Sequence, residues 1–134
     1  MIKLNTAKKC GVVFEQNIRP APYDHEVRAA WTLAQFYNTE LLFLRRRDID
    51  SSPDFMMFGI VWELKSPIGD GKRTIANNLR TAKGQSKNII LDLFRCKMHD
   101  YRAIAKARDY INKEVNDIKR LKIIKKSGEV IDIL

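Results

Sequence analysis

Residues 53–65 read PDFMMFGIVWELK, and this stretch organises the fold that the rest of the chain predicts. Two short apolar runs flank Gly59, which is typical of a β-hairpin or a tight strand pair. Side-chain alternation in the second run places Glu63 and Lys65 on one face, and the hairpin would bring Asp54 close to Glu63. Two carboxylates and an ammonium are costly to hold together on an apolar scaffold, so they indicate a site. The alternative is that Asp54 caps a strand turn and that Glu63 and Lys65 form an exposed cross-strand pair.

The segment before the hairpin predicts a short strand, then an amphipathic helix that begins near Asp24 as its N-cap, then a second strand at 41–44. The apolar stripe of the helix, at three- and four-residue spacing, comprises Val27, Ala30, Trp31, Ala34 and Tyr37. Glu26 borders this stripe. Its carboxylate is either a first-turn partner of the helix dipole or a group directed into the site. The loop that follows carries Arg45-Arg46-Arg47, which is either a solvated run or a phosphate contact.

The segment after the hairpin predicts a turn-rich loop at 66–73 and a second helix that Thr74 can cap. Ile75, Leu79 and Ala82 would form the inner face of that helix. Its surroundings are strongly basic, since five basic residues and no acidic one occur between Lys72 and Lys87. Such a track binds phosphates without reading sequence.

The last third of the chain predicts one central strand at 88–94, a long helix from about Asp100 to Leu121, and a terminal hairpin at 121–134. The apolar stripe of the long helix would comprise Tyr101, Ile104, Ala105, Ala107, Ile111, Val115 and Ile118. The order of elements is then β-α-β-β-β-α-β-α-β-β. We expect an α/β (α+β) fold, with one mixed central sheet flanked by helices, in a single domain of 134 residues.

Composition narrows the class of protein. A net charge of +9 points to a polyanionic partner, either nucleic acid or an anionic membrane surface. No apolar run approaches the roughly 18 residues of a membrane span, and the N-terminus lacks the apolar region of a signal peptide. Cys10 and Cys96 lack neighbours at metal-ligand spacing, so we expect free thiols in a reducing, cytoplasmic compartment.

The hairpin residues support two kinds of phosphodiester chemistry. Asp54 and Glu63, with Glu26 as a third carboxylate, can hold Mg²⁺ or another divalent metal through oxygen ligands, while Lys65 stabilises charge. Without metal, the same groups can perform acid–base cleavage of RNA, in which the 2′-hydroxyl is an internal nucleophile. Of the two histidines, His25 begins the first helix beside Glu26, and His99 lies in a polar turn where we expect it to be exposed.

Several segments together resemble a known family. The motif Pro53-Asp54 followed by Glu63-Leu64-Lys65, after a helix that carries Glu26, is similar to the PD-(D/E)xK nuclease superfamily. More narrowly, residues 20–134 resemble the C-terminal nuclease toxin domains of bacterial contact-dependent growth inhibition systems, particularly the group that cleaves transfer RNA. The most specific feature is WELKSP at 62–67 joined to QSKNIILDL at 85–93, and GKRTI at 71–75 also matches.

This resemblance implies a restriction-endonuclease-like core, nuclease activity on tRNA or other RNA, and neutralisation by an acidic immunity protein. The catalytic set would be Glu26, Asp54, Glu63 and Lys65, with Asp54 and Glu63 as the metal ligands. The substrate-binding set would be Lys72, Arg73, Thr74, Asn77, Arg80, Lys83, Gln85 and Ser86. The alternatives are a metal-dependent DNA endonuclease, a non-catalytic basic nucleic-acid-binding module, and an interaction protein whose positive face meets an acidic protein.

Overall fold

The computed structural model describes residues 10–15, 21–44, 53–114 and 116–134. The arginines at 45–47 and Val115 lie outside the described residues. The described elements follow the predicted order, and the expected mixed fold is confirmed. Their bounds are β1 Gly11–Phe14, α1 Asp24–Tyr37, β2 Glu40–Phe43, β3 Phe55–Met57, β4 Ile60–Lys65, α2 Thr74–Ala82, β5 Asn88–Asp92, α3 Asp100–Lys113, β6 Arg120–Ile124 and β7 Val130–Asp132.

The strands form one mixed seven-stranded sheet in which each strand lies beside its neighbour in sequence. The pairs β1–β2, β4–β5 and β5–β6 are parallel, and the other three pairs are antiparallel. The apolar run at 88–94 provides β5, which lies between two parallel partners as predicted for a central strand. Ile89, Ile90 and Leu91 are fully buried because both faces of this strand are covered.

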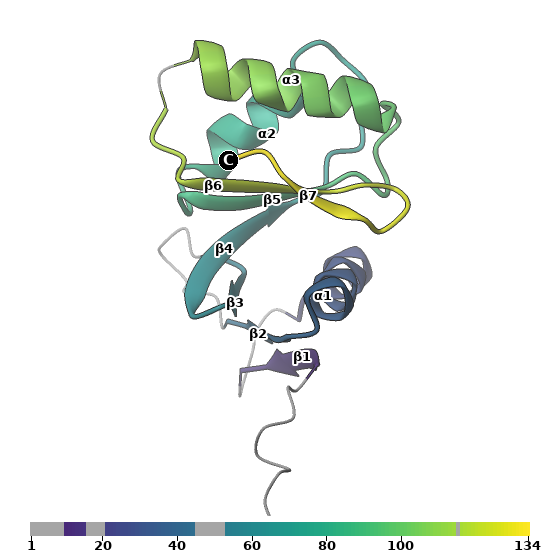
Figure 1. Cartoon of the computed structure of the whole chain (residues 1–134), viewed down its shortest axis with the longest axis vertical. Coiled ribbons are helices and arrows are strands. Elements are labelled where there is room, and N and C mark those ends of the chain that lie inside the picture. The colour runs from purple at the N-terminus through teal and green to yellow at the C-terminus, as the bar shows by residue number, and fades with distance from the viewer. Residues whose placement is uncertain (1–9, 16–20, 45–52, 115) are drawn as a thin grey trace, which may run out of the picture.

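The helices cover the two faces of the sheet (Figure 1). The crossovers β4–α2–β5 and β5–α3–β6 connect neighbouring parallel strands, and a common handedness places α2 and α3 on the same face. Their core contains Ile75, Leu79, Leu91 and Ala107. On the opposite face, α1 packs Leu33 against a second core that includes Trp62, Leu64 and Ile90. Residues of β4 therefore contribute to either face in strict alternation.

The β3–β4 hairpin has the predicted position and turns at Phe58 and Gly59, both with positive φ, 59° and 75°. Positive φ at both central residues fits the twist of a two-residue hairpin, and glycine adopts it at no steric cost. Trp62 is 1% exposed and its indole N–H donates to the Met57 carbonyl at 3.0 Å. These contacts fix the register that places residues 54 and 63 opposite each other.

The predicted buried face of α1 is wrong in part. Ala30 and Ala34 are fully buried as expected, but Trp31 is 43% exposed and the fully buried Leu33 was not predicted. The packed face follows residues 26, 29, 30, 33 and 34, so it is rotated from the face that the aromatic side chains suggested. The predicted N-cap was also displaced, because Tyr23 occupies that position and Asp24 is the first helical residue.

The long helix was predicted to reach Leu121, but α3 ends at Lys113. Asn116 explains part of the break, because its side-chain nitrogen donates to the Glu114 carbonyl and its oxygen accepts the Ile118 N–H. Residues 120–124 instead form β6, beside β5. Of the predicted stripe, Ala107 is fully buried, whereas Tyr101 is 75% exposed and Ala105 is exposed.

Two smaller predictions concern the cysteines and membrane spans. Cys10 and Cys96 are free thiols, as expected from their isolation in the sequence. Among the residues that the structure describes, none of the helices has the length and apolar character needed to cross a bilayer.

Candidate active site

The hairpin register brings Asp54 beside Glu63, as the sequence predicted. Phe55 pairs with Trp62, so Asp54 lies opposite Glu63, and the Asp54 N–H donates to the Trp62 carbonyl at 2.9 Å. The Leu64 N–H donates to Asp54 Oδ2 at 2.8 Å. Backbone groups of β4 therefore hold both the main chain and the carboxylate of Asp54 at the end of the hairpin ladder.

Glu63 is 2% exposed, so the alternative of an exposed cross-strand pair is wrong for this residue. Lys65 Nζ lies 3.2 Å from Glu63 Oε2, and the Lys65 side chain is 23% exposed. Glu63 Oε1 is buried and has no hydrogen-bond partner among the described residues. The site thus has a buried carboxyl group with one open oxygen and an ammonium that reaches solvent.

Burial raises the pKa of Glu63 from 4.5 to about 8. The negative charge of Asp54 adds to this rise, whereas the Lys65 ammonium opposes it. Near neutral pH, Glu63 is therefore mainly protonated. A carboxyl group with a raised pKa beside a second carboxyl group is an arrangement that enzymes use for separate acid and base roles. The pair titrates as a unit.

Glu26 lies in the first turn of α1. It belongs to α1, which packs on the Trp62 and Leu64 face of β4, whereas Glu63 and Lys65 belong to the opposite face. Glu26 Oε1 accepts the Tyr23 N–H at 2.9 Å, so the carboxylate takes part in the first-turn cap. This contact corresponds to the helix-terminus alternative, and Glu26 stays a catalytic prediction from the resemblance alone.

The described residues contain no group of three or more His, Cys, Asp or Glu side chains placed to hold a metal ion. Asp54 and Glu63 remain as two carboxylates, and the open Glu63 Oε1 offers one oxygen. Mg²⁺ is commonly held by one or two carboxylates, with water and substrate phosphate as its other ligands. The donor set therefore meets the minimum for Mg²⁺, although Lys65 lies beside the same carboxylate.

Two cations of the predicted basic track form ion pairs with acidic side chains in this structure. Arg80 donates to both carboxylate oxygens of Glu114, at 3.0 and 3.2 Å, and to Asn77 Oδ1 at 3.0 Å. Lys87 pairs with Asp117 at 2.7 Å. These ion pairs neutralise two of the five cations that the sequence placed between 72 and 87.

Thr74 has a different role from the predicted N-cap. Arg73 occupies the cap position, and Thr74 Oγ1 accepts the Gly71 N–H at 3.1 Å. The hydroxyl therefore closes the loop before α2. Arg73 itself is exposed, and Lys83 lies over the Tyr110 ring with its ammonium 5.8 Å from the ring centroid.

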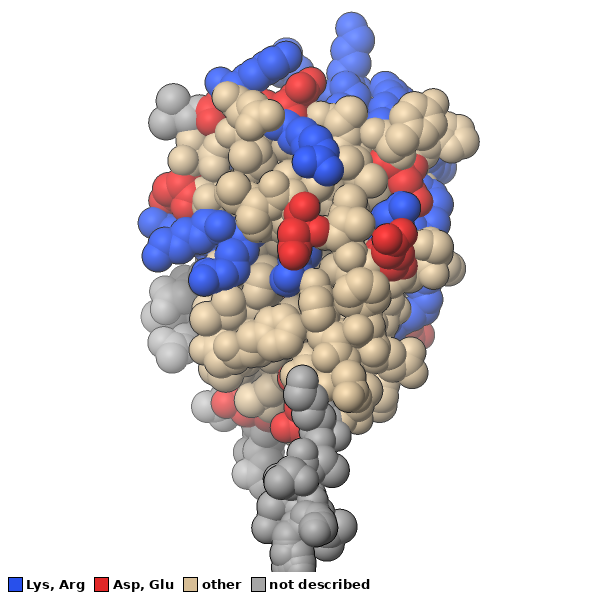
Figure 2. All heavy atoms as spheres, in the orientation of Figure 1, with Lys and Arg blue, Asp and Glu red and all other residues tan. Residues whose placement is uncertain are grey.

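Lys72 lies in a hollow between α2 and α3 with two cations that the sequence prediction missed. The hollow has a volume of about 210 Å³, and Lys106 and Lys113 line it with Lys72. The seven-residue spacing of Lys106 and Lys113 places them on one side of a helix and could have indicated that they lie together. The sequence interpretation instead assigned these charges to a solvent-exposed face. Figure 2 shows Lys and Arg side chains gathered over the upper part of the visible face, with acidic side chains among them.

Ser86 contacts the start of β4, and Gln85 precedes it after α2. The Ser86 hydroxyl donates to the Val61 carbonyl at 3.1 Å and accepts the Asn88 N–H, so it ties β4 to β5. Gln85 Oε1 is buried without a hydrogen-bond partner in the described part of the chain. Ser86 accordingly positions β4 relative to β5 in this structure, and the Gln85 side-chain oxygen remains available as a hydrogen-bond acceptor.

Asp92, at the end of β5, is a buried carboxyl group that sequence reasoning missed. It is 1% exposed, and burial raises its pKa, while the Phe94 N–H and the charges of Arg28 and His25 oppose the rise. Sequence reasoning missed Asp92 because this residue lies within the apolar run at 88–94. His99 is exposed, as predicted, and is the N-cap of α3.

Comparison with known proteins defines the class to which this fold and site belong. Residues 51–130 match the family described as the contact-dependent growth inhibition CdiA C-terminal domain. This match spans more than half of the chain, and the chain belongs to that family.

One solved structure extends the likeness over almost the whole chain. The CdiA-CT/CdiI toxin and immunity complex from Burkholderia pseudomallei is similar with a TM-score of 0.61 and 17% identity, over 91% of this chain and 97% of that chain. At this identity the similarity shows a shared fold. A search among curated proteins found no significant match. The growth-inhibition family was thus identified correctly from the sequence, and the PD-(D/E)xK assignment stays a prediction.

Proposed function

We propose that this chain is a nuclease toxin domain of the PD-(D/E)xK type that cleaves phosphodiester bonds of RNA, with tRNA as the favoured substrate. The observation that carries the proposal is the trio Asp54, Glu63 and Lys65, in which a buried carboxyl group contacts both a second carboxylate and an ammonium. Membership of the CdiA C-terminal family supports a toxic activity. The preference for RNA rests on the sequence resemblance.

The trio can perform acid–base cleavage of RNA. The Asp54 carboxylate takes the proton of a 2′-hydroxyl, whose oxygen then forms a bond to the adjacent phosphorus. Glu63, mainly protonated near neutral pH, gives its proton to the departing 5′-oxygen as the phosphorus–oxygen bond breaks. The Lys65 ammonium offsets the negative charge that develops on the non-bridging oxygens. The products are a 2′,3′-cyclic phosphate and a 5′-hydroxyl.

A metal-dependent DNA endonuclease is the second candidate, and the open oxygen of Glu63 favours it. Asp54 and Glu63 would hold the divalent ion, which would polarise a phosphoryl oxygen and lower the pKa of a bound water. Lys65 would then orient that water or stabilise charge on the phosphate.

One experiment separates the two candidates. The purified protein is incubated with total RNA and with plasmid DNA, each with Mg²⁺, with Mn²⁺ or with EDTA. RNA cleavage that persists in EDTA supports the acid–base scheme, whereas DNA cleavage that requires metal supports the second candidate. Salt-sensitive binding without cleavage under any of these conditions would show a non-catalytic binding module instead.

The partner and place of action follow from the same proposal. An immunity protein that neutralises this domain would be acidic, because it must meet a chain with a net charge of +9. The domain would act in the cytoplasm of a target cell, where tRNA is found. Co-purification of an acidic neighbour that blocks cleavage, with a salt-sensitive association rate, tests this part of the proposal.

A further inference from the structure

A pocket of about 200 Å³ lies outside the candidate active site, between α1, the residues that follow β5, and the β6–β7 turn. Its walls combine apolar, acidic and basic groups. Those that matter for recognition are Arg28, Ala29, Asp92, Phe94, Ile124 and Ser127. The pocket opens on the α1 side of the sheet. Lys65 pairs with Leu91, so Asp92 lies one residue beyond the level of Lys65 along the strands.

Asp92, which lines the pocket, has a buried carboxylate oxygen with no hydrogen-bond partner in the described part of the chain. Asp92 is 1% exposed, and its Oδ1 accepts the Phe94 N–H at 3.1 Å. Asp92 Oδ2 is buried without a hydrogen-bond partner among the described residues, although the side chain lines the pocket. A buried acceptor without a partner is costly, so this oxygen calls for a ligand that donates an N–H or O–H.

The mouth of the pocket offers a flat surface for stacking. The Phe94 ring is 49% exposed, and the Arg28 guanidinium lies over it. In RNA recognition, unstacked bases pack on aromatic rings and on guanidinium planes, and their edges form hydrogen bonds with nearby polar groups. Phe94 and Arg28 provide the stacking surface, and Asp92 provides the hydrogen-bonding group.

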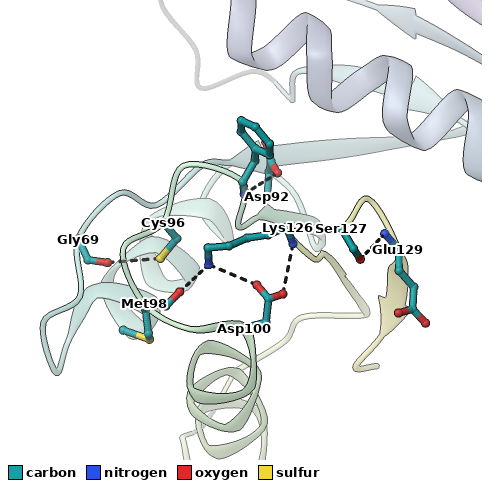
Figure 3. Close-up of polar contacts among 9 residues, drawn as sticks. Gly69, Asp92, Cys96, Met98, Asp100, Lys126, Ser127 and Glu129 are labelled. Carbon is teal, nitrogen blue, oxygen red and sulfur yellow. Dashed lines mark hydrogen bonds and ion pairs between the residues drawn. The ribbon is translucent and has the colours of Figure 1, made fainter.

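The lysines of the turn argue against a phosphate as the occupant. Lys126 Nζ donates to the Met98 carbonyl at 2.6 Å and lies 3.3 Å from Asp100 Oδ1 (Figure 3). Lys125 pairs with Glu129 at 3.1 Å. Both ammonium groups are thus engaged within the protein, and the Asp92 carboxylate would repel an anion placed against it.

We propose that this pocket binds an unpaired nucleobase that carries an exocyclic amino group. The amino N–H donates to Asp92 Oδ2 while the base packs against the exposed surface of the Arg28–Phe94 stack. Uracil is disfavoured, because its N3–H is flanked by two carbonyl oxygens that the carboxylate repels. This inference rests on the proposed nucleic-acid substrate, and it adds a base-binding site on the α1 side of the sheet, apart from the catalytic trio.

The test uses 5′-mononucleotides, which present a base but no phosphodiester bond to cleave. AMP, CMP, GMP, UMP and inorganic phosphate are titrated into the full chain, and amide NMR shifts at 92–94 and 126–128 report binding. The three amino bases should bind at least about tenfold more tightly than UMP, as expected for one hydrogen bond to a charged group. Equal binding of inorganic phosphate, or absence of shifts with every nucleotide, overturns the proposal.

Two variants separate the role of Asp92 in base selection from the role of Phe94 in stacking. Asp92→Asn keeps an oxygen for the Phe94 N–H but turns the open acceptor into a donor, so the preference for amino bases over UMP should disappear. Phe94→Leu should weaken all four nucleotides about equally, by roughly fivefold or more, because stacking is lost. An unchanged base preference in Asp92→Asn contradicts the inference. Cleavage assays are independent of this readout, so the nuclease proposal can fail or stand separately.

Discussion

The Lys65 ammonium lies 3.2 Å from the carboxyl group of Glu63, which is 2% exposed. A buried acid beside both an ammonium and a second carboxylate is energetically unfavourable as a purely structural feature. The position of Glu63 on a hairpin at the edge of a packed core gives the group of three side chains a defined geometry. The predictions below test what this relationship does for stability and for chemistry.

Glu63 should make the protein less stable as the pH rises. Its folded pKa of about 8 exceeds the ordinary 4.5, so the folded state binds the proton more tightly than the unfolded state. The free energy of unfolding therefore falls as the pH rises from about 5 to 8. In Glu63→Gln this contribution is absent, and thermal unfolding measured from pH 5 to 9 should show a smaller decline than in wild type. Parallel curves for the two proteins would contradict the raised pKa.

Cleavage should lose activity in alkaline solution. If Glu63 gives its proton to the leaving oxygen, kcat/KM falls above a pH near 8, where the acid becomes ionised. The measurement is initial-rate RNA cleavage between pH 6 and 10 at constant ionic strength. A rate that keeps rising through pH 9 would assign the acid role to another group.

Lys72 in the α2–α3 hollow should bind phosphate, whereas Lys87, which is paired with Asp117, should not. Lys72→Ala is expected to lower the slope of log K against log salt by about 0.7–0.9, the value for one phosphate contact. Lys87→Ala is the matched control, because Lys87 already pairs with Asp117 at 2.7 Å. RNA binding between 50 and 200 mM salt measures both slopes. An equal reduction of the salt slope in the two variants would show that the Lys87–Asp117 ion pair opens when RNA binds.

The corrected face of α1 leads to a stability prediction. Leu33 is fully buried against the sheet, so Leu33→Ala should lower the free energy of unfolding by about 2–5 kcal/mol. Trp31 is 43% exposed, and Trp31→Ala should cost much less despite the larger side chain. Urea unfolding of both variants makes the comparison. A greater loss for Trp31→Ala would restore the face that the aromatic pattern suggested.

Local patterns were sufficient for the order of elements and for the pairing within the hairpin. Alternation along β4 and the glycine at its turn determine that Asp54 meets Glu63, and both are visible in the sequence. The end of α3 could not be predicted in this way. Asn116 and the pairing of β6 with β5 end the helix, although the helical pattern continues in the sequence to Leu121.

Contacts between distant segments limited the prediction of the site. Whether Glu26 serves the helix terminus or the site could not be decided from sequence, because the packing of α1 against the sheet depends on tertiary structure. The ion pair of Arg80 with Glu114, 34 residues away, could not be seen in the local pattern, and substrate binding by Arg80 stays a prediction. Asp92 was read as part of an apolar strand, since only the fold brings Arg28 and the β6–β7 turn around it.

The most direct test of the central claim compares RNA cleavage by wild type, Glu63→Gln, Lys65→Met and Glu129→Gln, each shown to be folded by circular dichroism. Glu129 is an exposed carboxylate paired with Lys125, so its variant controls for the loss of one charge in an ion pair. We expect Glu63→Gln and Lys65→Met to reduce the cleavage rate by about 10²-fold or more, and Glu129→Gln to cleave as wild type does. Wild-type rates in folded Glu63→Gln and Lys65→Met would contradict the assignment of this hairpin as the active site.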